Sequence, residues 1–420
     1  MSDGTIFGAP IEFVLFGLTL AGLAVFHRHT LQVALGGMVV IAAHKILFAG
    51  FKTGPGIGGF LRHVGHEWVI LANLLGLLVG FALLSRHFEK SHVPIALGRF
   101  LPRGWKGGFV LLAIVWVLSS FLDNIAGALI GGAMAHQLFR ARVHIGYIAA
   151  IVAASNAGGA WSVVGDTTTT MMWIAGVSPI VIFECSIAAL VALFIFGIPA
   201  AVQQHRYSPM INDGHGHARV DSVRVGIVIV ILVFAITANA VVNLWFPKQA
   251  DHFPFLAVAV WIAIFLSVPL RRPDWELVPR AVGGSVFLLA LVVCASMMPV
   301  DRRLPSPSWQ TTLGLGFLSA VFDNIPLTAL ALKQGGYDWG FLAYAVGFGG
   351  SMIWFGSSAG VALCNLFPEA RSVGQWLRYG WAIVLAYVIG FFVMLAVVNW
   401  HPDTPAANPT DQEKLAFQSH

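Results

Sequence analysis

Charged residues are scarce in this chain. Asp, Glu, Lys and Arg make up only 10% of its 420 residues, whereas soluble domains carry about 25%. Hydrophobic residues make up 57%, and the mean hydropathy is +0.79. This composition excludes an ordinary soluble protein and predicts a membrane protein. The formal net charge of +5 then bears on membrane topology, and no nucleic-acid partner is expected.

Cysteine is also scarce. Cys185, Cys294 and Cys364 lie in or beside apolar segments and show no CxxC spacing. Neither a disulfide framework nor a cysteine metal site is predicted. The start of the chain lacks the short apolar core and cleavage site of a secretory signal, so residues from Ile11 onward are expected to form a retained span.

The chain is rich in long apolar runs. Since about 20 helical residues cross the hydrocarbon core of a bilayer, we expect simple spans at 11–27, 31–50, 67–85, 179–200, 225–246, 253–270, 281–299 and 376–399. Residues 86–105 mix basic and apolar side chains, which predicts an interfacial helix there rather than a span.

One short motif occurs twice. Asp-Asn-Ile stands at 123–125 and again at 323–325, each time four residues after a serine, Ser119 or Ser319. Both copies lie inside apolar stretches, where a charged side chain costs at least about 2.5–3.5 kcal/mol and usually marks a functional site. Two such copies, 200 residues apart, indicate two halves of a transporter that meet at a shared site.

The surrounding stretches are too long or too interrupted to be single helices. Residues 107–140 and 307–333 carry the motif near their middle, which is typical of a re-entrant hairpin. Residues 145–178 and 340–366 are broken by glycine and polar clusters. Such irregular backbone is tolerated in a membrane only where it is buried in protein or lines a cavity. The predicted fold is an all-α integral membrane protein with an inverted repeat of about five spans each, two re-entrant hairpins and two discontinuous helices.

The halves predict a simple domain organisation: a first repeat at 1–200, a cytoplasmic linker at 201–224, a second repeat at 225–400 and a polar tail at 401–420. An odd number of crossings per half turns the second half upside down. With the linker in the cytoplasm, most of the 24 basic residues fall on the inner side, as the positive-inside rule requires. The linker histidines belong either to a solvated loop or to a metal site.

Oxygen-bearing residues gather at the hairpin tips and helix breaks. A small cation in a membrane protein needs such ligands, and helix ends add unpaired carbonyls. The candidate ion- and proton-binding residues are Ser119, Asp123, Asn124, Asn156, Gly165, Asp166, Thr168 and Thr169 in the first half, and Ser319, Asp323, Asn324, Gly356, Ser357 and Ser358 in the second. Na⁺ is expected at Asp123, Asn124, Asp166, Asp323 and Asn324.

Three acids, Asp123, Asp166 and Asp323, stand in these motifs without any Lys or Arg. This favours a cation over an anion. Carboxylates crowded in a low dielectric bind protons more readily, so Na⁺ and H⁺ could compete for the same oxygens. Such competition is the minimal mechanism of an antiporter, which is not an enzyme and needs no cofactor beyond the ions it carries.

The motifs around Asn156 and Asp166 indicate a family. The run Ser155–Ser162, followed by Gly165-Asp166 and threonines up to Met171, strongly resembles the NhaD-type sodium/proton antiporters. These belong to the ion-transporter superfamily, together with the membrane subunits of arsenite pumps and Na⁺-coupled dicarboxylate carriers. The two serine and Asp-Asn motifs and the run Gly356–Val361 fit the same pattern.

The resemblance implies electrogenic exchange of Na⁺ or Li⁺ for H⁺, an elevator-type movement and a homodimer in the cell (inner) membrane, surrounded by lipid. Carried over by position, it assigns function to Ser119, Asp123, Asn124, Asn156, Asp166, Thr168, Thr169, Asp323, Asn324, Ser357 and Ser358. One departure is that Ile125–Ala128 stands where the family has a threonine-rich run.

Two other functions are compatible with parts of the sequence. A Na⁺-coupled anion carrier of the same fold would hold its substrate with serines and backbone amides. An intramembrane aspartyl protease also needs two buried acids, but its Gly-x-Gly-Asp signature is incomplete at Val163–Asp166 and no acid follows a Tyr inside a span. Glu184, near the start of its span, is either a proton relay or a structural residue.

Overall fold

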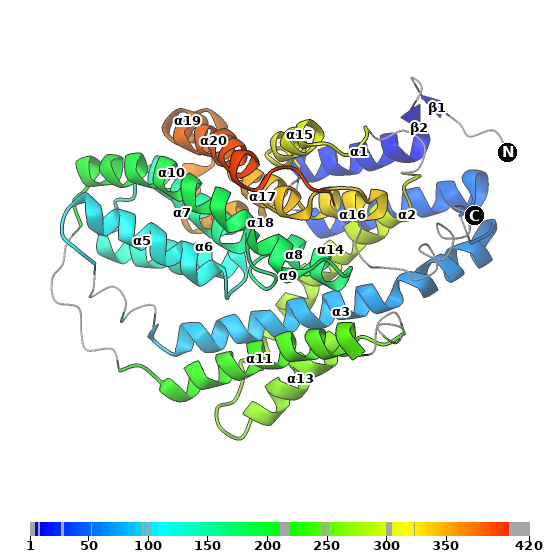
Figure 1. The fold of residues 1–420 in the computed structure, drawn as a ribbon, viewed down its shortest axis with the longest axis horizontal. Helices are drawn as coiled ribbons and strands as arrows, with labels where there is room; N and C mark the ends of the chain where they lie inside the picture. Colours follow the sequence, from blue (N-terminus) through cyan, green and yellow to red (C-terminus); the bar gives the residue numbers. More distant parts are fainter. Residues whose placement is uncertain are drawn as a thin grey trace.

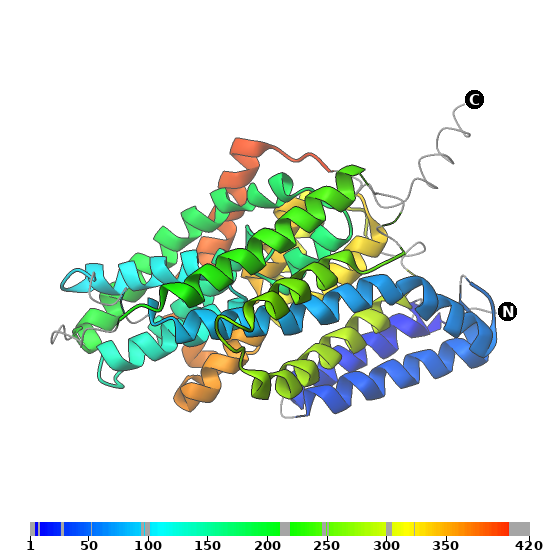
Figure 2. The same ribbon diagram turned by 90° about the horizontal axis from the view of Figure 1, so that it is seen from below.

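The computed structural model is built almost wholly of helices (Figure 1, Figure 2). It describes residues 5–6, 9–26, 29–51, 53–93, 96, 101–210, 219–245, 249, 252–299, 305–322 and 324–402. The one exception to the expected all-α fold within these ranges is a two-residue strand pair, β1 (Thr5–Ile6) and β2 (Ala9–Pro10).

Helices occupy every predicted span. In the first half they are α1 (Ile11–Val25), α2 (Thr30–His44) with a π-helical turn at Lys45–Ala49, α3 (Gly56–Lys90), α5 (Trp105–Ser119), α6 (Asn124–Leu138), α7 (Ile145–Ala160), α8 (Thr167–Ile174), α9 (Pro179–Phe183) and α10 (Cys185–Tyr207). In the second half they are α11 (Ser222–Trp245), α13 (Phe255–Ser267), α14 (Val278–Ser296) after a 3₁₀ turn at Trp275–Leu277, α15 (Trp309–Ser319), α16 (Asn324–Gln334), α17 (Trp339–Gly349), α18 (Ser358–Leu366), a 3₁₀ turn at Pro368–Ala370, α19 (Val373–Tyr379) and α20 (Trp381–Val398).

Several of these helices fit a bilayer. Five helical segments are long and apolar enough to cross a membrane: Thr30–Ala49, Gly56–Lys90, Pro179–Tyr207, Trp275–Ser296 and Trp381–Val398. Shorter apolar helices include α1, α5, α7, α11, α13 and α17. The chain is therefore a multi-pass membrane protein, and the number of ten crossings remains a prediction.

The helices pack in two groups. The long-helix group consists of α1, α2, α3, α11, α13 and α14, and the broken-helix group consists of α5–α10 and α15–α20. Figure 1 shows α3, α11 and α13 side by side along one flank, with α5, α6, α7 and α10 beyond them. The groups meet where α14 packs on α16 and α3 packs on α8.

The largest core lies mostly in the broken-helix group and extends to α3, α11 and α13, and it includes α7 and α17. Every residue of α7 from Gly146 to Ala160 is buried, and so is every residue of α17. A helix that is apolar and buried on all sides belongs inside a large protein or a bundle. These two helices end at the positions where the sequence breaks into glycine and polar residues.

Several boundaries differ from the sequence predictions. Helix α3 begins at Gly56 rather than at 67, and the span expected at 376–399 consists of α19 and α20, which are separated at Gly380. The separate interfacial helix expected at 86–105 is wrong at its start, because α3 continues without a break to Lys90. Its 35 residues measure about 52 Å, which exceeds a hydrocarbon core of about 30 Å. Helix α10 continues to Tyr207, so the stretch between the halves is shorter than 201–224. The linker histidines His215 and His217 lie outside the described residues.

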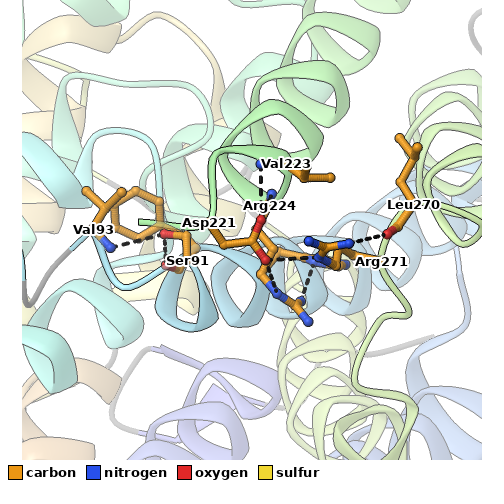
Figure 3. A network of polar contacts seen from close by, with 9 residues as sticks. Ser91, Val93, Asp221, Val223, Arg224, Leu270 and Arg271 are labelled. Atoms are coloured by element: carbon orange, nitrogen blue, oxygen red, sulfur yellow. Dashed lines mark hydrogen bonds and ion pairs between the residues drawn. The ribbon is translucent and has the colours of Figure 1, made fainter. Parts of the chain in front are cut away.

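Polar contacts join the ends of three helices of the long-helix group (Figure 3). Asp221 caps α11 by accepting hydrogen bonds from the backbone N–H groups of Val223 and Arg224, at 3.1 and 3.3 Å. Its other oxygen accepts from Arg271 Nε at 2.9 Å, just beyond α13. The Asp221 N–H donates to the Ser91 carbonyl oxygen after α3, at 2.9 Å.

A second carboxylate at this edge has a similar environment. Asp274 accepts hydrogen bonds from Lys90 Nζ at 2.7 Å and from Arg86 Nε at 3.0 Å. Hydrogen bonds from Lys90 and Arg86 lower the pKa of Asp274. In the same way, the hydrogen bond from Arg271 lowers the pKa of Asp221. The cationic side chains of this edge are thus matched by two ionised carboxylates.

Candidate functional site

Two pairs of short helices meet at the centre of the broken-helix group. Helix α7 ends at Ala160 and α8 begins at Thr167, while α17 ends at Gly349 and α18 begins at Ser358. The residues that restart the helices are good N-caps. Asp166 accepts from the Thr168 N–H at 2.8 Å, and Ser357 accepts from the Gly360 N–H at 3.2 Å. Asp and Ser at these positions explain why the helices begin there.

Glycines let the segments approach closely, and they do so in the same way in both halves. A Cβ on Gly158 would overlap the carbonyl oxygen of Trp116, and a Cβ on Gly349 would overlap that of Gly316. Trp116 and Gly316 are 200 positions apart, as are the two Asp-Asn-Ile motifs. The breaks therefore pack against α5 and α15 through equivalent backbone contacts.

The Asp166 carboxylate is the shared acceptor of the site, and only 2% of this residue is exposed. Asn124 Nδ2 donates to Asp166 Oδ2 at 2.8 Å, and Asn324 Nδ2 lies 3.4 Å from both carboxylate oxygens. Thr168 Oγ1 donates to Oδ1 at 2.9 Å. The asparagines of both copies of the repeated motif thus converge on one carboxylate.

Asn156 connects the two halves. Its side-chain oxygen accepts from Asn124 Nδ2 at 3.2 Å, while its Nδ2 donates to Ser351 Oγ and to Ser357 Oγ, both at 3.0 Å. All four residues are buried. A buried polar network of this kind is stable only when its members are satisfied, and here the Asn156 amide donates to two hydroxyls of the second half.

Other predicted hydroxyls are directed to backbone carbonyls. Ser119 Oγ lies 3.1 Å from Ser155 Oγ, which itself donates to the Asn124 carbonyl oxygen. Ser319 Oγ donates to the Val346 carbonyl oxygen at 2.7 Å. Thr169 Oγ1 donates to the Ser162 and Asp166 carbonyl oxygens at 2.6 and 2.9 Å. These hydroxyls brace the hairpins and the helix break around Asp166.

The remaining predicted residues lie close by. Asp123 occupies the N-cap position of α6 without a side-chain capping hydrogen bond, and its carboxylate interacts electrostatically with Asp166. Gly165 and Gly356 immediately precede the two caps and approach the carbonyl oxygens of Ser119 and Ala320, respectively. Asp323 lies outside the described residues.

Two residues of the network were not predicted, Ser155 and Ser351. Ser155 stands beside Asn156 within the motif that carries the family resemblance, so its position was a usable signal. Ser351 follows Gly350 in the second break, but nothing in its local sequence distinguishes it from other buried serines. Only the packing of α7 against α17 brings Ser351 to Asn156.

A cavity of about 270 Å³ lies beside the second break. Its lining includes Ser357, Ser358 and Asn365 from the broken-helix group, and Leu20 and Phe287 from the long-helix group. Three polar residues of the broken-helix group therefore line a cavity at the boundary between the groups. Oxygen atoms are the ligands that hard cations take.

Comparison with known proteins gives relatives of one kind. No family model matches the chain. It is 28% identical over 344 residues to sodium/proton antiporter 1 of Arabidopsis thaliana, covering 72% of this chain and 56% of that protein. It is 26% identical over 348 residues to the Na⁺/H⁺ antiporter NhaD of Vibrio parahaemolyticus, covering 70% of this chain and 80% of that protein. For the NhaD of Alkalimonas amylolytica, identity is 27% over 362 residues, with 71% and 72% covered.

The apolar helices and the buried polar centre define a multi-pass membrane protein, and its curated relatives are transporters. The resemblance that the motifs indicated is confirmed. This chain is related to the NhaD-type Na⁺/H⁺ antiporters of the ion-transporter superfamily. It spans little more than half the length of the Arabidopsis protein.

Proposed function

We propose that this protein exchanges Na⁺ or Li⁺ for H⁺ across the cell (inner) membrane, with Asp166 at the centre of the ion site. The observation that carries the proposal is the convergence of Asn124 and Asn324 on the Asp166 carboxylate. The side chains that donate to it, Asn124, Asn324 and Thr168, carry no charge, and a cation or a proton would neutralise the carboxylate. Relatives named sodium/proton antiporters support the same activity.

Competition between the ion and the proton follows from the chemistry of the site. Asp123 and Asp166 interact electrostatically in a buried environment, where two carboxylates cannot both remain charged without a cation or a proton nearby. Bound Na⁺ would take oxygens from Asp123, Asn124, Asp166, Asp323 and Asn324. Protonation of a carboxylate would remove that charge and release the ion.

We further propose that the two halves form an inverted repeat with two re-entrant hairpins. The paired contacts Gly158–Trp116 and Gly349–Gly316 support this arrangement. So do the matching caps, Asp166 on α8 and Ser357 on α18. Half-helices that face each other at mid-membrane are the usual ion-binding geometry of inverted-repeat transporters.

Alternating access would be achieved by an elevator-type movement. The site residues named above all belong to the broken-helix group, so this group could carry the ion as a unit past the long-helix group. Thr30 also lines the cavity beside Ser357, and the predicted topology places Thr30 on the cytoplasmic side. The cavity would serve as the inner access route. A homodimer formed through the long-helix group would hold that group fixed.

The test uses purified protein in proteoliposomes with an imposed pH gradient that a trapped dye reports. Na⁺, Li⁺ and K⁺ are added in turn, and then succinate in the presence of Na⁺. We expect Na⁺ or Li⁺ alone to dissipate the gradient. Na⁺-dependent uptake of labelled succinate without any cation response would instead make the protein an anion carrier.

Two matched carboxylate variants locate the site. Asp166→Asn should abolish the Na⁺ response, because the amide can neither ionise nor exchange a proton. Asp274→Asn removes a carboxylate at the edge of the long-helix group and should leave exchange unchanged. Normal exchange by Asp166→Asn would overturn the assignment of the site.

A further inference from the structure

Three metal-ligating side chains converge away from the ion site, where three helical segments begin or end. Glu184 stands between α9 and α10, Asp338 caps α17, and His401 follows α20. One ligand atom from each residue lies within 4.8 Å of the ligand atoms of the other two. The three residues come from positions far apart in the sequence, so only the packing of α10, α17 and α20 brings them together.

The His401 imidazole lies between the two carboxylates. Its Nε2 is 3.3 Å from Glu184 Oε2, and its Nδ1 is 3.3 Å from Asp338 Oδ2. The His401 backbone N–H also donates to Asp338 Oδ2 at 2.9 Å. Asp338 is 0% exposed, whereas the His401 side chain is 44% exposed. The cluster therefore combines a fixed, buried ligand with an open side through which an ion can enter.

One oxygen of the cluster lacks a hydrogen bond. Glu184 Oε2 is buried and accepts no hydrogen bond within the described part of the chain, although His401 Nε2 lies within ion-pair distance. Asp338 oxygens, by contrast, accept from the backbone N–H groups of Phe341 and His401. A buried acceptor without a partner costs about 1–3 kcal/mol. A bound cation would remove that cost.

We propose that Glu184, Asp338 and His401 form a binding site for a divalent transition-metal ion, of which Zn²⁺ fits best. Zinc takes imidazole nitrogen and carboxylate oxygen as ligands, and sites with three protein ligands keep a fourth position open. Tetrahedral zinc with bonds of about 2.0–2.1 Å separates neighbouring ligand atoms by about 3.3–3.4 Å. The 3.3 Å between His401 Nε2 and Glu184 Oε2 matches this spacing, and one ligand atom of each of the three residues lies within 4.8 Å of the others.

The bound ion would join the end of α20 to the starts of α10 and α17. Helix α17 leads directly to Gly349 and to Ser351, which contacts Asn156 in the ion site. The zinc site is nevertheless separate from the Asp166 network, because it shares no residue with that network. Zinc that binds only the folded protein should raise its melting temperature.

The experiment uses full-length protein in detergent, carrying an affinity tag without histidine and stripped of metal with EDTA. Zn²⁺ is titrated against a chromogenic indicator to obtain stoichiometry and affinity, and Co²⁺ is added separately for its visible spectrum. We expect one Zn²⁺ per chain, a Co²⁺ spectrum of low-symmetry coordination and a higher melting temperature with Zn²⁺.

Variants distinguish this site from other surface ligands. Glu184→Gln, which keeps the side-chain shape, and His401→Ala should each weaken Zn²⁺ binding by more than about 10-fold and remove the thermal shift. His66→Ala, on α3, is the matched control and should bind like the parent. Asp166→Asn should also keep the zinc site, whatever it does to transport. Unchanged binding by Glu184→Gln and His401→Ala, or no binding by the parent protein, would overturn the proposal.

Discussion

The two helix breaks at the centre of the molecule share a backbone frame but carry different side chains. Gly158 and Gly349 make equivalent contacts with α5 and α15, and each break ends in a capping residue. The first break supplies a carboxylate, Asp166, whereas the second supplies a hydroxyl, Ser357. Asp166 contacts the two motif asparagines and Ser357 contacts Asn156, so the two breaks contribute different side chains to one network.

The two breaks also differ at the position ten residues before the cap. Asn156 stands ten positions before Asp166, and the residue ten positions before Ser357 is Gly347. A Cβ on Gly347 would lie 3.1 Å from the Ala160 Cβ and 4.0 Å from Asp166 Oδ2. The space beside Gly347 is therefore filled by Ala160 of the first half, and the second half places no side chain at the position that corresponds to Asn156. The two helix breaks can keep the same backbone packing, which depends on glycine, and still carry different side chains. Those side chains determine the chemistry of each break.

The largest expected effect comes from moving the charge between the caps. Asp166→Ser should abolish Na⁺-dependent dissipation of the pH gradient, because the only described carboxylate that both asparagines contact is lost. Adding Ser357→Asp restores a carboxylate near Asn156 on the other side of the site. If the two frames are equivalent, the double variant should recover measurable exchange in proteoliposomes.

Ser357→Asp in the otherwise unchanged protein is the control for this swap, since it adds a second acid to the site. Well-folded Asp166→Ser protein that still exchanges Na⁺ at the parental rate would refute the central role of Asp166.

Adding a methyl group to either glycine should destabilise the contacts of the two helix breaks with α5 and α15 to a similar extent. Gly158→Ala and Gly349→Ala each place a methyl group against a carbonyl oxygen, and overpacking a close contact costs about 1–3 kcal/mol. Both should lower the melting temperature in detergent by similar amounts.

Gly314→Ala on α15 is the matched control, because a Cβ there meets nothing within 4 Å and alanine favours helix. Melting temperatures of the two frame variants that equal that of Gly314→Ala would contradict the close packing.

Loss of the second cap should have a smaller effect. Ser357→Ala removes the hydrogen bond to the Gly360 N–H, which is worth about 0.5–2 kcal/mol at a helix N-terminus. It also removes one of two hydroxyl partners of Asn156 Nδ2. We expect a modest fall in melting temperature and a higher Na⁺ concentration for half-maximal exchange. Ser357→Thr keeps the hydroxyl and should behave more like the parent.

The smallest effect concerns acid stability at the edge of the long-helix group, far from both breaks. Lys90 and Arg86 lower the pKa of Asp274, and Arg271 lowers that of Asp221. A carboxyl whose pKa is lower in the folded state stabilises the protein above its unfolded pKa of about 3.9, and this contribution is lost as the pH falls through the folded value. Stability should therefore decline below about pH 4.

Asp274→Asn tests this origin by melting curves between neutral pH and pH 3. The variant should melt slightly lower than the parent at neutral pH, and the difference should shrink as the pH falls. A constant difference across the range would show that Asp274 contributes through packing rather than through charge.

Much of the architecture was predictable because helix formation is local. Apolar runs of about 20 residues produced helices at each expected position, and Asp166 and Ser357 were recognisable before any contact was known, because glycine and polar residues interrupt the apolar pattern there. The end of the α3 helix was mispredicted, since basic residues at 86–90 are also typical of the last turn of a long helix. There, positive side chains stabilise the exposed carbonyls.

The sequence by itself determined the membrane class, the duplicated Asp-Asn-Ile motif and the family resemblance, because each depends on residues that are close along the chain. Tertiary structure alone decided which oxygens share a centre. It directed Ser119 and Ser319 toward other hydroxyls and carbonyls, brought Ser351 to Asn156, and gathered Glu184, Asp338 and His401 from three helices. Contacts between positions far apart in the sequence depend on how whole helices pack. The spacing of residues along the chain does not predict that packing.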